Sequence, residues 1–132
     1  MQTAIISGIL AVSFYLAALI LQAMTVFTRK DRNSKVFLFG ALAVLFHGFN
    51  VYGVIRANDG YQFGFFEIST LIAFSISSLV MISSVRKPLE NLFLCLFPLA
   101  ILAIVASLFS TSTTPSTELN IGLATHILLS IL

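Results

Sequence analysis

The chain is poor in the residues on which soluble and disulfide-bonded proteins depend. Only 9% of its 132 residues are charged, and it has no tryptophan and one cysteine. A soluble domain carries about 25% charged residues, so this composition excludes a globular fold in water. One cysteine excludes an internal disulfide, and we expect Cys95 to be a buried thiol that packs as a small hydrophobe.

Sequence motifs for several chemistries are also missing. The sequence has no CxxC or CxxCH motif, and therefore no attachment site for c-type haem. It has no glycine-rich phosphate loop, no cluster of zinc ligands and no nucleophile triad, so nothing here points to an enzyme. The seven basic residues stand in short groups between apolar segments, which indicates membrane topology rather than nucleic-acid binding.

Apolar residues make up 58% of the chain, and its mean hydropathy is +1.05. They form runs long enough to cross a hydrocarbon core of about 30 Å, at a rise of about 1.5 Å per residue. We predict an all-α, polytopic transmembrane helical bundle in a single domain, 1–132. Four full spanning helices and the start of a fifth are expected at 4–27, 36–55, 65–85, 89–110 and 121–132.

Two features refine this prediction. Pro98 lies inside the fourth helix and should kink it. The fifth apolar run has only 12 residues, where a spanning helix needs about 20. We therefore expect 1–132 to be the N-terminal fragment of a longer membrane protein.

The basic residues predict the orientation in the lipid bilayer. Arg56 is the only one on its side of the membrane. The other six are Arg29, Lys30, Arg32, Lys35, Arg86 and Lys87. By the positive-inside rule this second side is cytoplasmic. The N-terminus and residues 111–120 then face outward, which in a bacterium is the periplasm.

Histidines inside membrane helices are costly and indicate function by default. His47 shares one helical stripe with Gly40, Ala43 and Asn50, at spacings of three and four residues. The small residues let another helix approach closely, and Asn50 is placed to orient the imidazole. Two interpretations stay open for His47, a hydrogen bond between helices and a ligand role.

The second histidine, His126, lies near the start of the fifth apolar run. It shares a stripe with Gly122 and Ser130. From the helical rise we expect it roughly 8–10 Å below the outer surface, at a depth similar to that of His47. Two imidazoles at one depth can serve a single buried haem through its iron, or they can be unrelated.

Other polar residues each leave two interpretations. Glu67 either caps the start of the third helix, where a carboxylate meets the positive end of the helix dipole, or relays protons. Arg56 either marks a helix end or pairs with a carboxylate such as a haem propionate. Thr70, Ser77 and Ser84, spaced by seven, either pack closely and bond to backbone carbonyls or line a path.

Several segments resemble a known family. His47, the segment 66–71 (FEISTL) and the segment 123–130 (LATHILLS) are similar to the N-terminal half of YpjD-type inner-membrane proteins. This group belongs to the CcsA-like cytochrome c assembly superfamily. The resemblance extends over essentially the whole chain.

The resemblance implies a role as well as a fold. Its members have about eight spanning helices, lie in the bacterial inner membrane and handle haem during cytochrome c maturation. It implies that His126 ligates haem iron on the outer side, with His47 as a second ligand or an orienting group. Haem and other cytochrome c assembly proteins are the expected partners. The alternative is a non-enzymatic membrane scaffold or small transporter subunit in which the histidines are structural.

Overall fold

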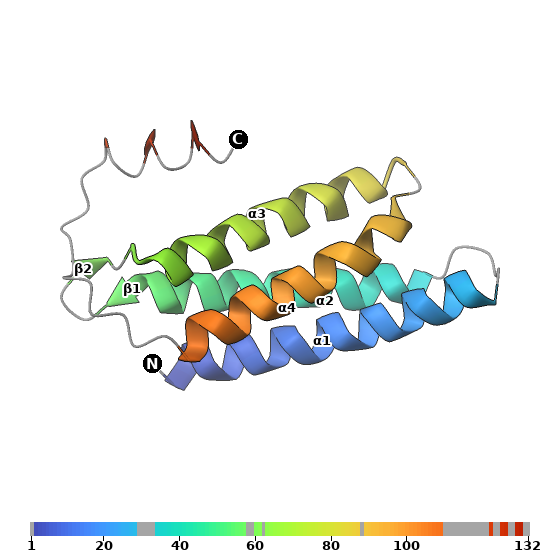
Figure 1. The fold of residues 1–132 in the computed structure, drawn as a ribbon, viewed down its shortest axis with the longest axis horizontal. Coiled ribbons are helices and arrows are strands. Elements are labelled where there is room, and N and C mark those ends of the chain that lie inside the picture. The colour runs from blue at the N-terminus through green and yellow to red at the C-terminus, as the bar shows by residue number, and fades with distance from the viewer. Residues whose placement is uncertain are drawn as a thin grey trace.

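The computed structural model describes residues 2–28, 34–57, 60–61, 63–87 and 89–109, and positions 122, 125, 126, 129 and 130. Four α-helices dominate this part of the chain and run antiparallel in sequence order (Figure 1). They are α1 (Gln2–Phe27), α2 (Ser34–Ile55), α3 (Phe65–Ser84) and α4 (Phe93–Phe109). The predicted helical bundle is therefore confirmed.

The first three helices are long and apolar enough to cross a membrane. Their ends lie within two residues of the predicted ones. α4 has 17 residues and follows a short 3-10 helix, η1 (Glu90–Leu92), so it is shorter than the predicted span of 89–110. α4 stays helical through Pro98. Part of the fifth predicted helix, 121–132, lies outside the described residues.

Two ends of the bundle can be distinguished by their basic residues. α2 ends at Ile55, and Arg56 begins a two-residue strand, β1 (Arg56–Ala57), that pairs antiparallel with β2 (Gly60–Tyr61). This pair returns the chain toward α3, and residues 58 and 59 lie outside the described part. We call this end, which also holds the N-terminus, the Arg56 end (Figure 1). The opposite end holds Arg86, just after α3.

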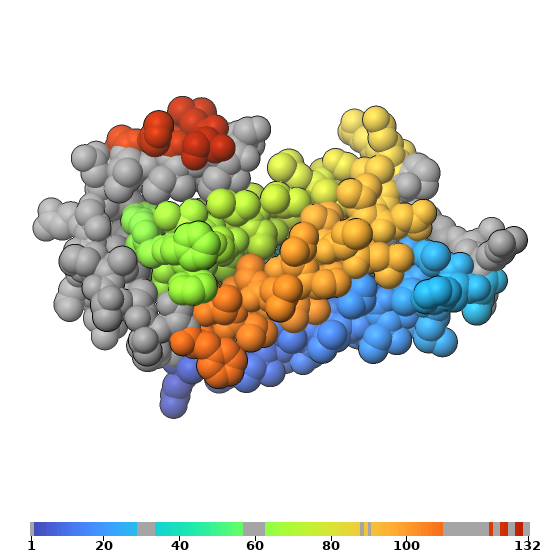
Figure 2. Space-filling view, in the orientation of Figure 1, coloured from blue at the N-terminus to red at the C-terminus, as the bar shows by residue number. Residues whose placement is uncertain are grey.

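The helices pack through small and aromatic residues. α1 packs most extensively against α2, and α4 lies against α1 and α3 (Figure 2). The core consists of Ala11, Tyr15, Ala18, Val36, Ala43, Met81, Phe93, Phe97, Ala100 and Ile104. Alanines on α1 let the helices approach closely, and the aromatic rings of α4 fill the space that remains.

Large apolar side chains cover the outside of the bundle. Ile20, Leu38, Ile82 and Leu102 are each more than half exposed, one on each of the four helices. Interior positions instead include polar residues such as His47. Soluble proteins rarely expose so much contiguous apolar surface, whereas lipid accommodates it without cost. The distribution agrees with the spanning lengths of α1, α2 and α3.

The structure corrects the prediction for Cys95. This side chain was expected to be buried, but it is exposed on α4. The buried stripe of α4 runs through Phe93, Phe97 and Ala100, and Cys95 lies two residues away from Phe93 and Phe97. Two residues correspond to about 200° around a helix, so Cys95 faces outward.

Candidate functional site

The most polar part of the interior is centred on His47. Its Nδ1 lies 3.1 Å from the Tyr15 hydroxyl of α1, and its Nε2 lies 3.1 Å from the Thr70 hydroxyl of α3. All three side chains are fully buried. We call these residues, Tyr15, His47 and Thr70, the polar junction. It connects three helices through one imidazole.

Aromatic rings enclose the polar junction. Tyr15 meets the imidazole edge-on, with ring centroids 5.8 Å apart, and Phe74 does so from α3 at 5.6 Å. Phe97 of α4 packs on Tyr15 at 5.1 Å. Ser77, seven residues beyond Thr70 on the same stripe of α3, is buried as well. The imidazole therefore lies in a closed apolar pocket with its hydrogen-bonding needs met.

The two hydroxyls suit either neutral form of the imidazole. A neutral histidine has one N–H donor and one acceptor nitrogen, and a hydroxyl can act as either donor or acceptor. Iron binds to the lone pair of one ring nitrogen. Binding through Nε2 would break the hydrogen bond to Thr70, and binding through Nδ1 would break the hydrogen bond to Tyr15. This geometry supports the hydrogen bond between helices as the role of His47. Its ligand role stays a prediction.

The polar stripe of α2 was predicted well, but the role given to Asn50 was not. Gly40, Ala43, His47 and Asn50 are all buried, as expected. Asn50 does not orient the imidazole, because Tyr15 and Thr70 hold both ring nitrogens. Its Nδ2 instead donates to the Ala4 carbonyl of α1 at 2.8 Å. Its buried Oδ1 has no hydrogen-bond partner among the described residues.

The hydroxyl stripe of α3 faces the interior. Thr70, Ser77 and Ser84 are all buried, which confirms that they share one face. Thr70 bonds to a side chain of another helix rather than to a backbone carbonyl. Three serines of α3 do bond to carbonyls of their own helix, and they lie outside this stripe: Ser69, Ser75 and Ser78.

Glu67 lies in the first turn of α3 and is only 2% exposed. The N-cap residue is Gly64, and no side chain makes a cap hydrogen bond there. Glu67 therefore makes no capping hydrogen bond, contrary to the prediction, and only its position in the first turn, at the positive end of the helix dipole, agrees with that prediction. Its Oε2 has no hydrogen-bond partner within the part of the chain that is described. The proton-relay role of Glu67 stays a prediction.

His126 differs from His47 in its surroundings. It lies in a helical turn and is exposed, as are Gly122 and Ser130. None of the hydrogen bonds or ring contacts of His47 involves His126. Over the described residues, no group of three or more His, Cys, Asp or Glu side chains could hold a metal ion.

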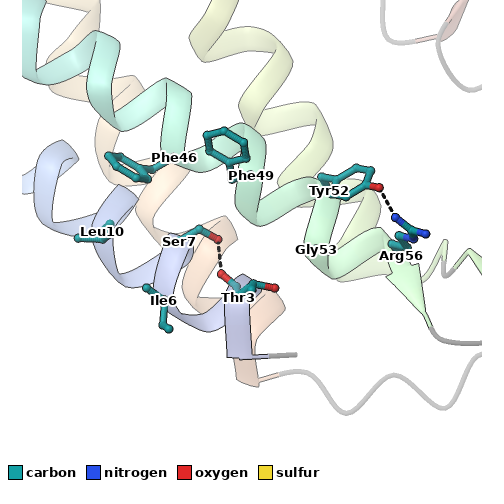
Figure 3. Close-up of a pocket in the computed structure, with 9 residues that line it drawn as sticks. All are labelled: Thr3, Ile6, Ser7, Leu10, Phe46, Phe49, Tyr52, Gly53 and Arg56. Carbon is teal, nitrogen blue, oxygen red and sulfur yellow. Dashed lines mark hydrogen bonds between the residues drawn. The ribbon is translucent and has the colours of Figure 1, made fainter.

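A groove opens between α1 and α2 at the Arg56 end (Figure 3). It encloses about 580 Å³. The lining residues are Thr3, Ile6, Ser7, Leu10, Phe46, Phe49, Tyr52, Gly53 and Arg56. The Arg56 guanidinium donates a hydrogen bond to the Tyr52 hydroxyl and lies 5.6 Å from the centroid of that ring. We call this feature the α1–α2 groove.

Sequence reasoning missed Tyr15. The signal that could have found it is the buried stripe of α1, with Ala4, Gly8, Ala11, Tyr15, Ala18 and Gln22 at alternating spacings of four and three. A tyrosine on a stripe of small residues needs space for its ring in the neighbouring helices and a hydrogen-bond partner for its hydroxyl.

No protein-family model, curated protein or solved structure matches this chain.

Proposed function

We propose that this chain belongs to a membrane factor that handles haem during cytochrome c assembly and is not itself an enzyme. His126 is its iron ligand, and His47 positions three helices through the polar junction. The observation that carries the proposal is the exposure of His126. An exposed imidazole can offer a nitrogen to iron without breaking helix packing, and the resemblance of residues 123–130 to the YpjD-type segment supplies the ligand class.

In this proposal the chain crosses the bacterial inner membrane four times. η1 and α4 together cover Glu90–Phe109, and we propose that they form the fourth span. The described basic residues support the orientation, since Lys35, Arg86 and Lys87 flank one end of the bundle and Arg56 the other. The Arg56 end, with the N-terminus, then faces the periplasm.

Haem binding is tested by absorbance of the purified full-length protein. We expect a Soret band after reconstitution with haem, and its loss in His126→Ala. The matched control is Ser130→Ala, one turn further along the same stripe, which should keep the band. A Soret band that is unchanged in His126→Ala would overturn the assignment of this ligand.

A second candidate is a membrane scaffold or small transporter subunit with structural histidines. The specific observation that favours it is the engagement of both ring nitrogens of His47. A preparation that stays colourless after reconstitution with haem, and that loses stability in His126→Ala, would support this candidate and reject haem handling.

The topology has its own test. A tag placed in the segment around Lys30 should be protected from impermeant reagents in intact cells, whereas a tag near Asn58 should react. The reverse pattern would reject both the orientation and the presentation of haem on the outer side. Recovery of the chain in the supernatant after high-speed centrifugation without detergent would reject membrane insertion altogether.

A further inference from the structure

The α1–α2 groove has the shape of a binding site for one lipid chain. The lining begins at Arg56, the residue that follows α2, and runs back along α2 to Phe46. This length is about 15 Å at the helical rise. This distance is about half of a hydrocarbon core of about 30 Å, and therefore the depth of one leaflet. The volume of about 580 Å³ lies within the range of small-molecule sites.

The polar groups of the groove gather at one end. Arg56 and Tyr52 lie at its mouth, at the end of α2, whereas Leu10, Phe46 and Phe49 form the deeper walls (Figure 3). Because α2 has 22 residues and spans about 33 Å, its end at Ile55 lies near the surface of the bilayer. Arg56 is therefore level with the lipid headgroups, whereas Leu10, Phe46 and Phe49 lie at the depth of the acyl chains.

The mouth of the groove suits a phosphate. Tyr52 holds the Arg56 guanidinium through a hydrogen bond and through its ring face. A guanidinium has five N–H donors, and the bond to Tyr52 uses one of them, so the same group can bind a phosphate through two parallel hydrogen bonds. Arg56 is also the one basic residue at its end among the described residues.

The groove is open toward the surrounding membrane. Ile6, Phe49 and Tyr52 are each 59% exposed, so a ligand can enter sideways from the bilayer. We propose that the α1–α2 groove binds one anionic phospholipid. Its phosphate pairs with Arg56, and one acyl chain lies against Leu10, Phe46 and Phe49. This site is separate from the polar junction and does not depend on haem binding.

The test is native mass spectrometry of the purified protein in detergent, titrated with phosphatidylglycerol or with phosphatidylcholine of the same acyl chains. We expect phosphatidylglycerol to bind more tightly. Arg56→Gln should weaken that binding at least tenfold, because the charge-assisted hydrogen bonds to the phosphate are lost, and should abolish the preference. The matched control is Arg86→Gln, which removes an exposed basic residue at the opposite end and should change binding less than twofold.

A second pair of variants tests the apolar part of the groove. Ile6→Trp fills the groove from an exposed position and should remove the bound lipid, whereas Ile9→Trp adds the same ring on α1 outside the groove and should not. Circular dichroism confirms that all variants keep their helices. Equal effects of Arg56→Gln and Arg86→Gln, or of the two tryptophan variants, would overturn the proposal. The proposal would also be overturned if Ile6→Trp alone abolished a Soret band, because haem would then occupy the groove. Loss of a dimer in Ile6→Trp alone would likewise show that a second copy of the chain occupies it.

Discussion

The polar junction and the α1–α2 groove contain similar chemical groups in opposite settings. Each combines a tyrosine, a nitrogen-bearing side chain and hydroxyls. In the polar junction every partner comes from another helix, and aromatic rings close the space around it. In the groove Arg56 and Tyr52 come from one segment and face outward.

The difference follows from depth in the membrane. A polar group in the bilayer core has no water to bond, so it must find a partner inside the protein. Near the surface a guanidinium can bond to headgroups and water, and its exposure costs little. The two regions should therefore respond differently to mutation, the polar junction through stability and the groove through binding.

Within the polar junction and the groove, the largest effect on stability should come from His47→Leu. The substitution leaves the hydroxyls of Tyr15 and Thr70 without their shared partner in an apolar pocket, and we expect a loss of about 3 kcal/mol of unfolding free energy. Reversible unfolding in mixed micelles measures it. Leu45→Ala, two residues away on the exposed face of α2, is the control and should change stability by less than about 0.5 kcal/mol. Equal losses would show that the polar junction does not stabilise the bundle.

The second largest loss of stability should come from a substitution where α1 and α2 approach closely. A Cβ at Gly53 would lie 2.9 Å from Cβ and 3.3 Å from Cα of Ala4, so Gly53→Ala must push the helices apart. We expect a loss of about 1–3 kcal/mol, measured by the same unfolding assay.

Its control is the double variant Ala4→Gly with Gly53→Ala, which removes the nearest clashing atom. Part of the lost stability should return in this variant relative to Gly53→Ala. A failure of Gly53→Ala to destabilise the protein would contradict the observed helix contact.

Single hydroxyl removals should have smaller effects. Tyr15→Phe and Thr70→Val each remove one hydrogen bond to His47, at about 1 kcal/mol apiece. Because both act on one imidazole, the double variant should deviate from additivity by about 0.5 kcal/mol or more. Ser69→Ala, which removes a hydroxyl bonded only to its own helix, is the control for Thr70→Val. Strict additivity would mean that the two bonds are independent.

The smallest effect is expected on the outer face of α4. Cys95→Ala should change stability by less than about 0.5 kcal/mol, because the thiol is exposed. Phe97→Ala, two residues away in the core, should cost about 3–5 kcal/mol. A large loss for Cys95→Ala would contradict the orientation of α4.

The helices were predicted more accurately than the interactions between them. Runs of apolar residues located α1, α2 and α3 closely, because spanning length depends on local composition. The buried stripe of His47 and Asn50 also followed from helical periodicity. The prediction that Cys95 is buried was wrong because almost every residue of α4 is apolar. Periodicity then cannot distinguish the two faces of this helix.

By itself the sequence determined the apolar helices of spanning length and the sides of the helices that carry small or polar residues, since these depend on neighbours within a few positions. Only the tertiary structure decided that His47 bonds to Tyr15, 32 positions away, and to Thr70, 23 positions away. Those partners depend on the register at which whole helices pack, which no local pattern specifies. The same register opens the α1–α2 groove beside Arg56.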